Sequence, residues 1–199
     1  MNVKLYLGIV SLVPAVVAYY FYFRGIVRGT TKPHAFSWAI WGSLAGIGFV
    51  TQVSAHAGVG AWVTGLTSLA SLTIFCFALR VGTVRSSPFD WSLLCLAALS
   101  LVLLLVVKDE VAALGLTLIA LISGFVMNAR KAYKKPQEEN ATAFGLNTLK
   151  FVPAIFALTH ITFLTAAYPM VAAMGNAAIT IIVWTRGGWA TSRNADIHL

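Results

Sequence analysis

Residues 12–41 read LVPAVVAYYFYFRGIVRGTTKPHAFSWAIW, two apolar runs separated by a short basic connection. The first run contains Pro14, and the second opens on Ser37 and Trp41. A proline inside a helix removes one backbone hydrogen bond and bends the helix. Lipid tolerates such a bend only where neighbouring groups satisfy the freed backbone. The stretch therefore predicts two membrane-spanning helices, the first of them kinked.

The composition extends this interpretation to the whole chain. Of its 199 residues, 59% are apolar and 10% are charged, and the mean hydropathy is +0.83. A water-soluble domain of this size leaves exposed about 30% of the surface that its unfolded chain exposes. A chain this apolar would then expose too much apolar surface to water. Apolar windows close to the roughly 20 residues that a helix needs to cross a bilayer recur along the sequence. The sequence predicts an all-α integral membrane protein.

Seven apolar segments can be delimited, with short linkers between the fourth and fifth and between the sixth and seventh. They lie at about residues 5–23, 35–53, 58–79, 91–107, 111–128, 147–166 and 169–185. No small-residue cleavage site follows the first segment, so we interpret it as a transmembrane helix and not as a signal peptide.

Basic residues fall in alternate connections between these segments. Eleven of the fourteen lie on one side: Arg24, Arg28, Lys32, Arg80, Arg85, Arg130, Lys131, Lys134, Lys135, Arg186 and Arg193. Lys4 and Lys108 fall on the other side, and Lys150 is expected about one turn inside segment 147–166, where it can snorkel to the cytoplasmic surface. The positive-inside rule then places the N-terminus outside and the C-terminus in the cytoplasm. The net charge of +8 is explained without a nucleic-acid partner.

The order of the segments suggests an internal repeat. A shift of 108 residues places the first three segments on the last three, with Val63 on Val171 and Ser68 on Asn176. Few residues are identical, and what repeats is the pattern of long basic and short neutral connections. The sequence thus predicts a 3+1+3 plan, with two parallel three-helix repeats at residues 1–83 and 109–199 and a linker helix at 84–108.

This plan resembles the PQ-loop and SWEET sugar-transporter superfamily. The residues that carry the resemblance are LVPAVVAYYFYFRGIVRGTTKPHAFSW at 12–38, although the glutamine that follows the family's proline is Ala15 here. The corresponding stretch LISGFVMNARKAYKKPQEENATAFG at 121–145 has no intramembrane proline. The SWAIW sequence at 37–41 is also similar to the tryptophan pair of Pnu-type vitamin transporters. The resemblance, shared with uncharacterised bacterial proteins, implies a transporter in a bacterial plasma membrane.

Polar groups at membrane depth supply the candidate substrate-binding residues. Asn176 and its repeat partner Ser68, beside Thr67, are expected at mid-depth, and an amide there can bind a neutral solute or make an interhelical hydrogen bond. Ser37, Trp41 and Gln52 share one helical face. Trp41 can stack on a ring, whereas Trp38 is expected to anchor the membrane surface.

Other residues are candidates for moving parts. The resemblance implies that Pro14 and Pro153 act as hinges, and static kinks are the alternative. Asn128, Asn147 and Lys150 are expected at an inner gate, or else form a polar cluster at the helix ends. His160 is expected inside segment 147–166, where it can relay a proton or simply bond a neighbour.

These residues together favour a facilitator that moves a small uncharged polar solute, such as a sugar or a vitamin-like nucleoside, by alternating access. All six acidic residues are expected in loops or tails, so no carboxylate is available for ion coupling. No metal-binding cluster, cofactor motif or activated nucleophile is present, which argues against an enzyme. The alternatives are a non-transporting assembly partner or sensor and, more weakly, a proton-coupled exporter that uses His160. The lipid bilayer and the solute are the expected partners, and a homo-oligomer is compatible with the sequence.

Overall fold

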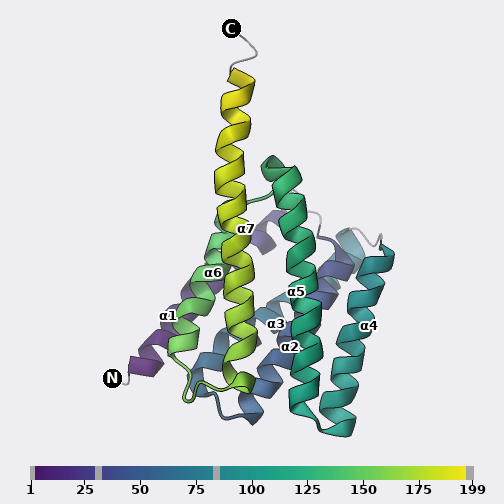
Figure 1. Ribbon diagram of the computed structural model, residues 1–199, viewed down its shortest axis with the longest axis vertical. Helices are drawn as coiled ribbons and strands as arrows, with labels where there is room; N and C mark the ends of the chain where they lie inside the picture. The colour runs from purple at the N-terminus through teal and green to yellow at the C-terminus, as the bar shows by residue number, and fades with distance from the viewer. Residues whose placement is uncertain (1–2, 30–32, 83–85, 196–199) are drawn as a thin grey trace.

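A computed structural model describes residues 3–29, 33–82 and 86–195, with the backbone alone at 138 and 187–195. Seven α-helices and no strand form in this part of the chain (Figure 1). The helices are α1 (Val3–Val27), α2 (Ala35–Ser54), α3 (Trp62–Val81), α4 (Pro88–Val102), α5 (Glu110–Lys134), α6 (Ala141–Phe156) and α7 (Phe163–Ala195). The short turns η1 (Gly58–Ala61), η2 (Leu103–Val107) and η3 (Pro136–Glu138) join or extend them. The all-α prediction is confirmed.

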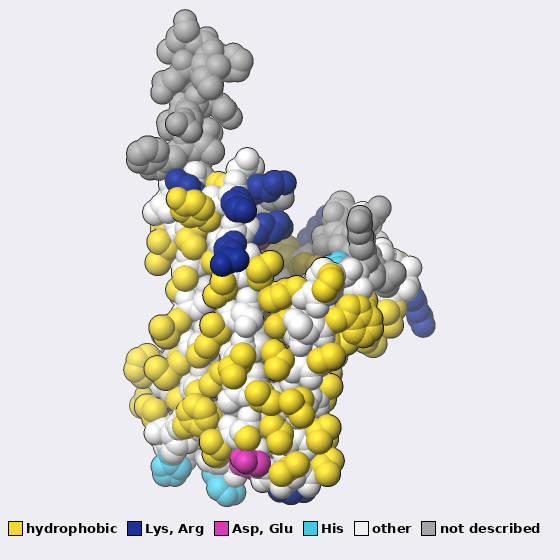
Figure 2. All heavy atoms as spheres, turned by 45° about the vertical axis from the view of Figure 1, so that its right-hand side comes forward, with side chains coloured by type: hydrophobic (Ala, Val, Ile, Leu, Met, Phe, Trp, Pro, Cys, Tyr) yellow, Lys and Arg dark blue, Asp and Glu magenta, His cyan; other side chains and the backbone are white. Residues whose placement is uncertain are grey.

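Six helices of the described chain are long and apolar enough to cross a membrane, α3 and α4 together with their adjoining turns. Large apolar side chains face outward along them: Leu69, Met174 and Trp184 each expose more than 60% of their surface. Figure 2 shows such side chains covering the flank of the molecule. Because water would make this exposure unfavourable, the flank is suited to lipid. These are the features of an integral membrane protein.

The sixth helix departs from the expected segment 147–166. Asn140 accepts a hydrogen bond from the backbone N–H of Ala143, so α6 starts at residue 141. It ends at Phe156, and its 16 residues span about 24 Å, less than the roughly 30 Å of a hydrocarbon core. Thr162 and Thr165 then cap α7 reciprocally through their hydroxyls. The apolar window had combined the end of α6, an irregular connection and the start of α7.

The helices pack in a repeating pattern. α3 contacts both α1 and α2, and α7 likewise contacts both α5 and α6. α1 packs on α6 and α2 on α5, while α4 lies against α2 and α5 at the edge of the bundle (Figure 1). Gly42 and Gly46 allow the close approach of α2 and α3, since a Cβ at these positions would meet Leu72 and Ser68. This glycine pair therefore serves helix packing.

Basic residues mark one end of the bundle, where α1, α3 and α5 terminate. Arg24, Arg80, Lys131 and Lys134 lie in the last turns of these helices. Figure 2 shows the dark-blue side chains gathered mainly there. Lys32, Arg85 and Asp196 lie outside the described residues, and the side chains of Glu138 and Arg193 are not described. We refer to this end as the basic end.

Candidate functional site

A cavity of about 390 Å³ lies among α1, α2, α3, α5, α6 and α7. It is lined by Ala18, Tyr19, Tyr22, Ser37, Trp38, Trp41, Thr67, Ser71, Leu121, Phe125, Asn128, Ala143, Phe144, Asn147, Lys150, Phe151, Tyr168, Ala172 and Asn176. Ser37 and Ala143 belong to the first turns of α2 and α6 at the basic end, whereas the rings of Phe151 and Tyr168 are buried at the opposite limit. The cavity therefore opens toward the basic end.

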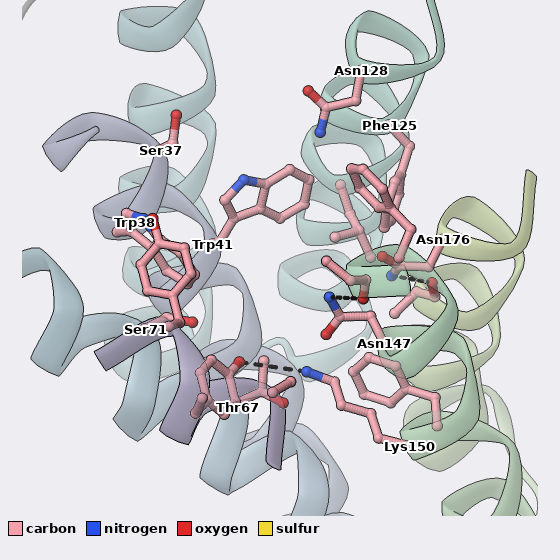
Figure 3. A pocket seen from close by; sticks show the side chains of 18 of the residues that line it. Ser37, Trp38, Trp41, Thr67, Ser71, Phe125, Asn128, Asn147, Lys150 and Asn176 are labelled. Carbon is pink, nitrogen blue, oxygen red and sulfur yellow. Dashed lines mark hydrogen bonds between the residues drawn. The ribbon is translucent and has the colours of Figure 1, made fainter. Parts of the chain in front are cut away.

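Hydrogen-bonding groups from facing helices converge on this cavity (Figure 3). The Nδ2 of Asn176 donates to the carbonyl of Ala172 at 2.7 Å. The hydroxyl of Thr67 donates to the carbonyl of Val63 at 2.6 Å. Among the described residues, no hydrogen bond involves the Oδ1 of Asn176 or the hydroxyl of Ser71. These groups remain available to a solute.

Aromatic rings form much of the cavity wall. Trp41 packs against Phe125 of α5 with ring centroids 5.4 Å apart, and a Cβ at Gly124 would lie 2.9 Å from the Trp41 ring. Trp38 donates from Nε1 to the hydroxyl of Tyr22 at 3.1 Å. The ring of Trp38 thus lines the cavity and bridges α1 and α2, and its expected role as a surface anchor stays a prediction. Tyr22 also lines the cavity, from α1.

Lys150 is the cation of the cavity. The side chain is 2% exposed, and its Nζ lies 3.4 Å from the hydroxyl of Tyr19, across the space between α6 and α1 (Figure 3). The prediction that Lys150 snorkels from the first turn is wrong, because α6 begins at residue 141 and places Lys150 in its third turn. An apolar environment makes such a charge costly, by about 2.5–3.5 kcal/mol at a bilayer centre.

Below the cavity, the end opposite the basic residues is tightly closed. Gly48 lies against the ring of Tyr168, where a Cβ would approach to 2.6 Å. Beyond it, the Nε2 of Gln52 donates to the carbonyl of Thr165 at 2.7 Å. The backbone N–H of Thr159 donates to the carbonyl of Ala57 at 2.9 Å. α2 is thus bonded to the first turn of α7, and the residue before η1 is bonded to the connection between α6 and α7.

Two predicted binding residues lie outside the cavity. Ser68 donates to the carbonyl of Gly42 at 2.9 Å and serves the α2–α3 contact. Gln52 is fully buried at the closed end, with its Oε1 unpartnered among the described residues. Ser37, Trp41 and Gln52 do lie on one face of α2, as predicted. Only Ser37 and Trp41 line the cavity, because Gln52 lies beyond its closed end.

His160 is also misplaced by the sequence prediction. It lies in the exposed connection between α6 and α7 and not inside a helix, because α6 ends four residues earlier. The premise of a proton relay through this imidazole is therefore wrong.

The remaining candidates lie near the cavity or in the helices that form it. Asn128 and Asn147 line the part of the cavity nearer the basic end, where Asn147 donates to the carbonyl of Ala143 at 3.1 Å. Pro14 and Pro153 lie inside α1 and α6, and Pro169 adds a third intrahelical proline in α7 that sequence analysis did not single out. Lining residues that sequence analysis missed are spaced three or four apart, such as Tyr19 and Tyr22, or Tyr168 and Ala172. This spacing shows which residues share a helical face, but packing decides whether that face lines a cavity.

The chain was compared with families, curated proteins and solved structures. No family model matches it, and no curated protein or solved structure is significantly similar to it.

Proposed function

We propose that this protein is a membrane facilitator that moves a small polar solute by alternating access. The two moving units are α1–α3 and α5–α7, joined by α4 in a 3+1+3 plan as in the PQ-loop and SWEET transporters. The observation that carries the proposal is the cavity of about 390 Å³, which has polar groups at mid-depth and one closed end. Its volume lies near the lower limit of ligand-binding pockets, which favours a small solute.

The cavity lining supports two equivalent units. α2 begins at Ala35 and α6 at Ala141, a separation of 106 residues that replaces the shift of 108 expected from sequence. At this separation, lining residues of the first unit fall on lining residues of the second: Tyr19 on Phe125, Tyr22 on Asn128, Ser37 on Ala143, Trp38 on Phe144 and Trp41 on Asn147. On α3 and α7 the separation is 105, with Thr67 on Ala172 and Ser71 on Asn176.

The closed end supports alternating access. Its bonds, from Gln52 to Thr165 and from Thr159 to Ala57, join one unit to the other. Opening the cavity at its closed end would require these contacts to break while the cavity closes at the basic end. We propose that Pro14 and Pro153 supply the bending that this motion needs.

Charge supports an uncoupled mechanism and an orientation. No carboxylate among the described residues lines the cavity, which favours facilitated movement over coupling to protons or sodium ions. With the basic end in the cytoplasm, the C-terminus lies inside, the N-terminus lies outside, and the conformation described here is open inward.

Uptake by proteoliposomes tests the proposal. The Asn176→Ala variant is expected to lower the initial rate of solute uptake about tenfold, because it removes one of the amide groups that face the solute. Thr180→Ala is the matched control one turn further along α7, since its hydroxyl bonds the backbone of its own helix and does not line the cavity.

The uptake panel covers sugars, nucleosides and small organic acids, each measured with and without protein. Equal leakage of every solute with and without protein would contradict the facilitator, and the docking or sensor alternative would then gain weight. A similar loss in Asn176→Ala and Thr180→Ala would remove Asn176 from the binding site.

A further inference from the structure

The amine of Lys150 is held in the cavity by weak partners. Nζ lies 5.0 Å from the ring centroids of Tyr19 and Phe151, and its hydrogen bond to the Tyr19 hydroxyl is long at 3.4 Å. Aromatic faces attract a cation, but they do not neutralise it. Of the three N–H donors of an ammonium group, the described residues accept from one.

No acidic side chain in the described chain balances this charge. The described ion pair, Lys131 with Glu139 at 2.7 Å, lies at the basic end and not at Lys150. Asp90 and Asp109 cap the N-termini of α4 and α5, and Glu110 lies in the first turn of α5. Buried charges in proteins are normally paired, so an unpaired amine that faces a cavity points to a counter-charge carried by the ligand.

The other lining residues indicate what the uncharged part of the ligand is like. Thr67 and Ser71 on α3 and Asn176 on α7 offer hydrogen bonds, and the rings of Trp41 and Phe125 form an aromatic wall. One lysine supplies one positive charge, without the arginine fork or the clustered backbone N–H groups that typify phosphate sites. A single carboxylate on a small ring or hydroxylated body fits this arrangement.

We infer that the solute is a small organic monocarboxylate, whose carboxylate binds Nζ of Lys150 while its body lies between Asn176 and the aromatic wall. This inference rests on the proposed function and replaces the uncharged solute expected from sequence. The neutral expectation came from the amide of Asn176 and left Lys150 outside the binding site, whereas the structure buries the Lys150 side chain in the cavity wall. The basic end would also attract anions to the mouth of the cavity.

Matched pairs of ligands test the inference and do not require the natural solute to be identified. The probes are nicotinate with nicotinamide, benzoate with benzamide, and lactate with lactamide, each pair differing chiefly in charge. Binding to the purified full-length protein in detergent is followed by tryptophan fluorescence, because Trp38 and Trp41 line the cavity. At least one carboxylate is expected to bind about tenfold more tightly than its amide.

Three variants give the comparison its controls. Lys150→Met keeps a side chain of similar length without its charge. In this variant the ratio of the Kd for the amide to the Kd for the carboxylate is expected to fall to about one. Lys150→Arg is expected to retain part of the preference for the carboxylate. Lys134→Met removes an exposed lysine from the basic end and is expected to change nothing. Lys150→Gln replaces Lys150→Met if that variant does not fold.

The outcomes separate this inference from the proposed transport. Equal binding of carboxylate and amide in every pair, or a preference that survives Lys150→Met, overturns the inference. Proteoliposome flux of a neutral solute that is unchanged by Lys150→Met also overturns it, while transport itself stands. A carboxylate preference that depends on Lys150 in a protein that moves no solute supports the anion site and removes the transport proposal.

Discussion

A disulfide between positions 58 and 159 is expected to stop solute uptake and to release it again when reduced. A Cβ at Gly58 would lie 3.6 Å from the Cβ of Thr159, within the range that a disulfide needs. This link would join η1 to the connection between α6 and α7, where the two units meet at the closed end. If transport requires this end to open, oxidation of the Gly58→Cys/Thr159→Cys protein should lower the rate of uptake tenfold or more. The remaining uptake would come from the fraction of protein that is not cross-linked.

The measurement is uptake in proteoliposomes before and after reduction, in a background with Cys76 and Cys95 replaced. Gly58 has a φ of 69°, so a cysteine there strains the backbone and lowers the folding stability by about 1–2 kcal/mol. Uptake by the reduced variant shows the effect of this strain without the disulfide. Gly46→Cys/Ser68→Cys is the matched control, because its Cβ atoms would be 4.0 Å apart within one unit. Undiminished uptake in the oxidised 58–159 protein would contradict alternating access at this end.

Replacing Gly60 by alanine is expected to shift the protein away from the conformation described here. Its new methyl group would lie 2.7 Å from the carbonyl oxygen of Ala154 and 2.8 Å from the backbone nitrogen of Leu158. Backbone atoms cannot rotate aside as a flexible side chain can, and overpacking of this kind costs about 1–3 kcal/mol. Because η1 and α6 belong to different units, that cost falls on the closed end, and each 1.4 kcal/mol changes the population of an open state about tenfold.

Maleimide labelling of a cysteine at position 166 measures the shift. Ala166 is buried with Ala57, Ala61 and Leu158 at the closed end, so Ala166→Cys should react slowly in the parent and about tenfold faster with Gly60→Ala. Gly115→Ala is the control, since a Cβ there would meet no atom within 4 Å. A drop in melting temperature without faster labelling would mean that the methyl group destabilises the fold and moves no gate.

The sequence predicted the helices well where a polar residue or a charge ended an apolar run. α2 begins within the predicted boundary because Pro33 and His34 precede it, and the Nδ1 of His34 accepts from the backbone N–H of Ser37. The prediction failed at α6, because residues 157–162 are apolar enough to extend a hydropathy window although they are not helical. The capping signals at Asn140 and at Thr162 with Thr165 were present in the sequence, and capping would have corrected both boundaries.

The two boundary errors at α6 explain the misplacement of Lys150 and His160. Starting α6 six residues late placed Lys150 at the surface, and ending it ten residues late placed His160 in the membrane. Asn176, Trp41 and Thr67, which the sequence proposed as binding residues, line the cavity, and each lies well inside a helix whose central residues were predicted. Tyr19, Phe125 and Ser71 were missed for a different reason, since which face of an apolar helix lines a cavity depends on tertiary packing.

The burial of Lys150 also bears on how this protein responds to engineering. An unbalanced positive charge in an apolar interior lowers the free energy of unfolding, so methionine at this position should raise the melting temperature. A screen that selects variants only for heat resistance would then favour loss of the residue on which we expect solute recognition to depend. Stability and activity would thus compete at position 150, and the most robust variant for biophysical work would be the least informative about transport.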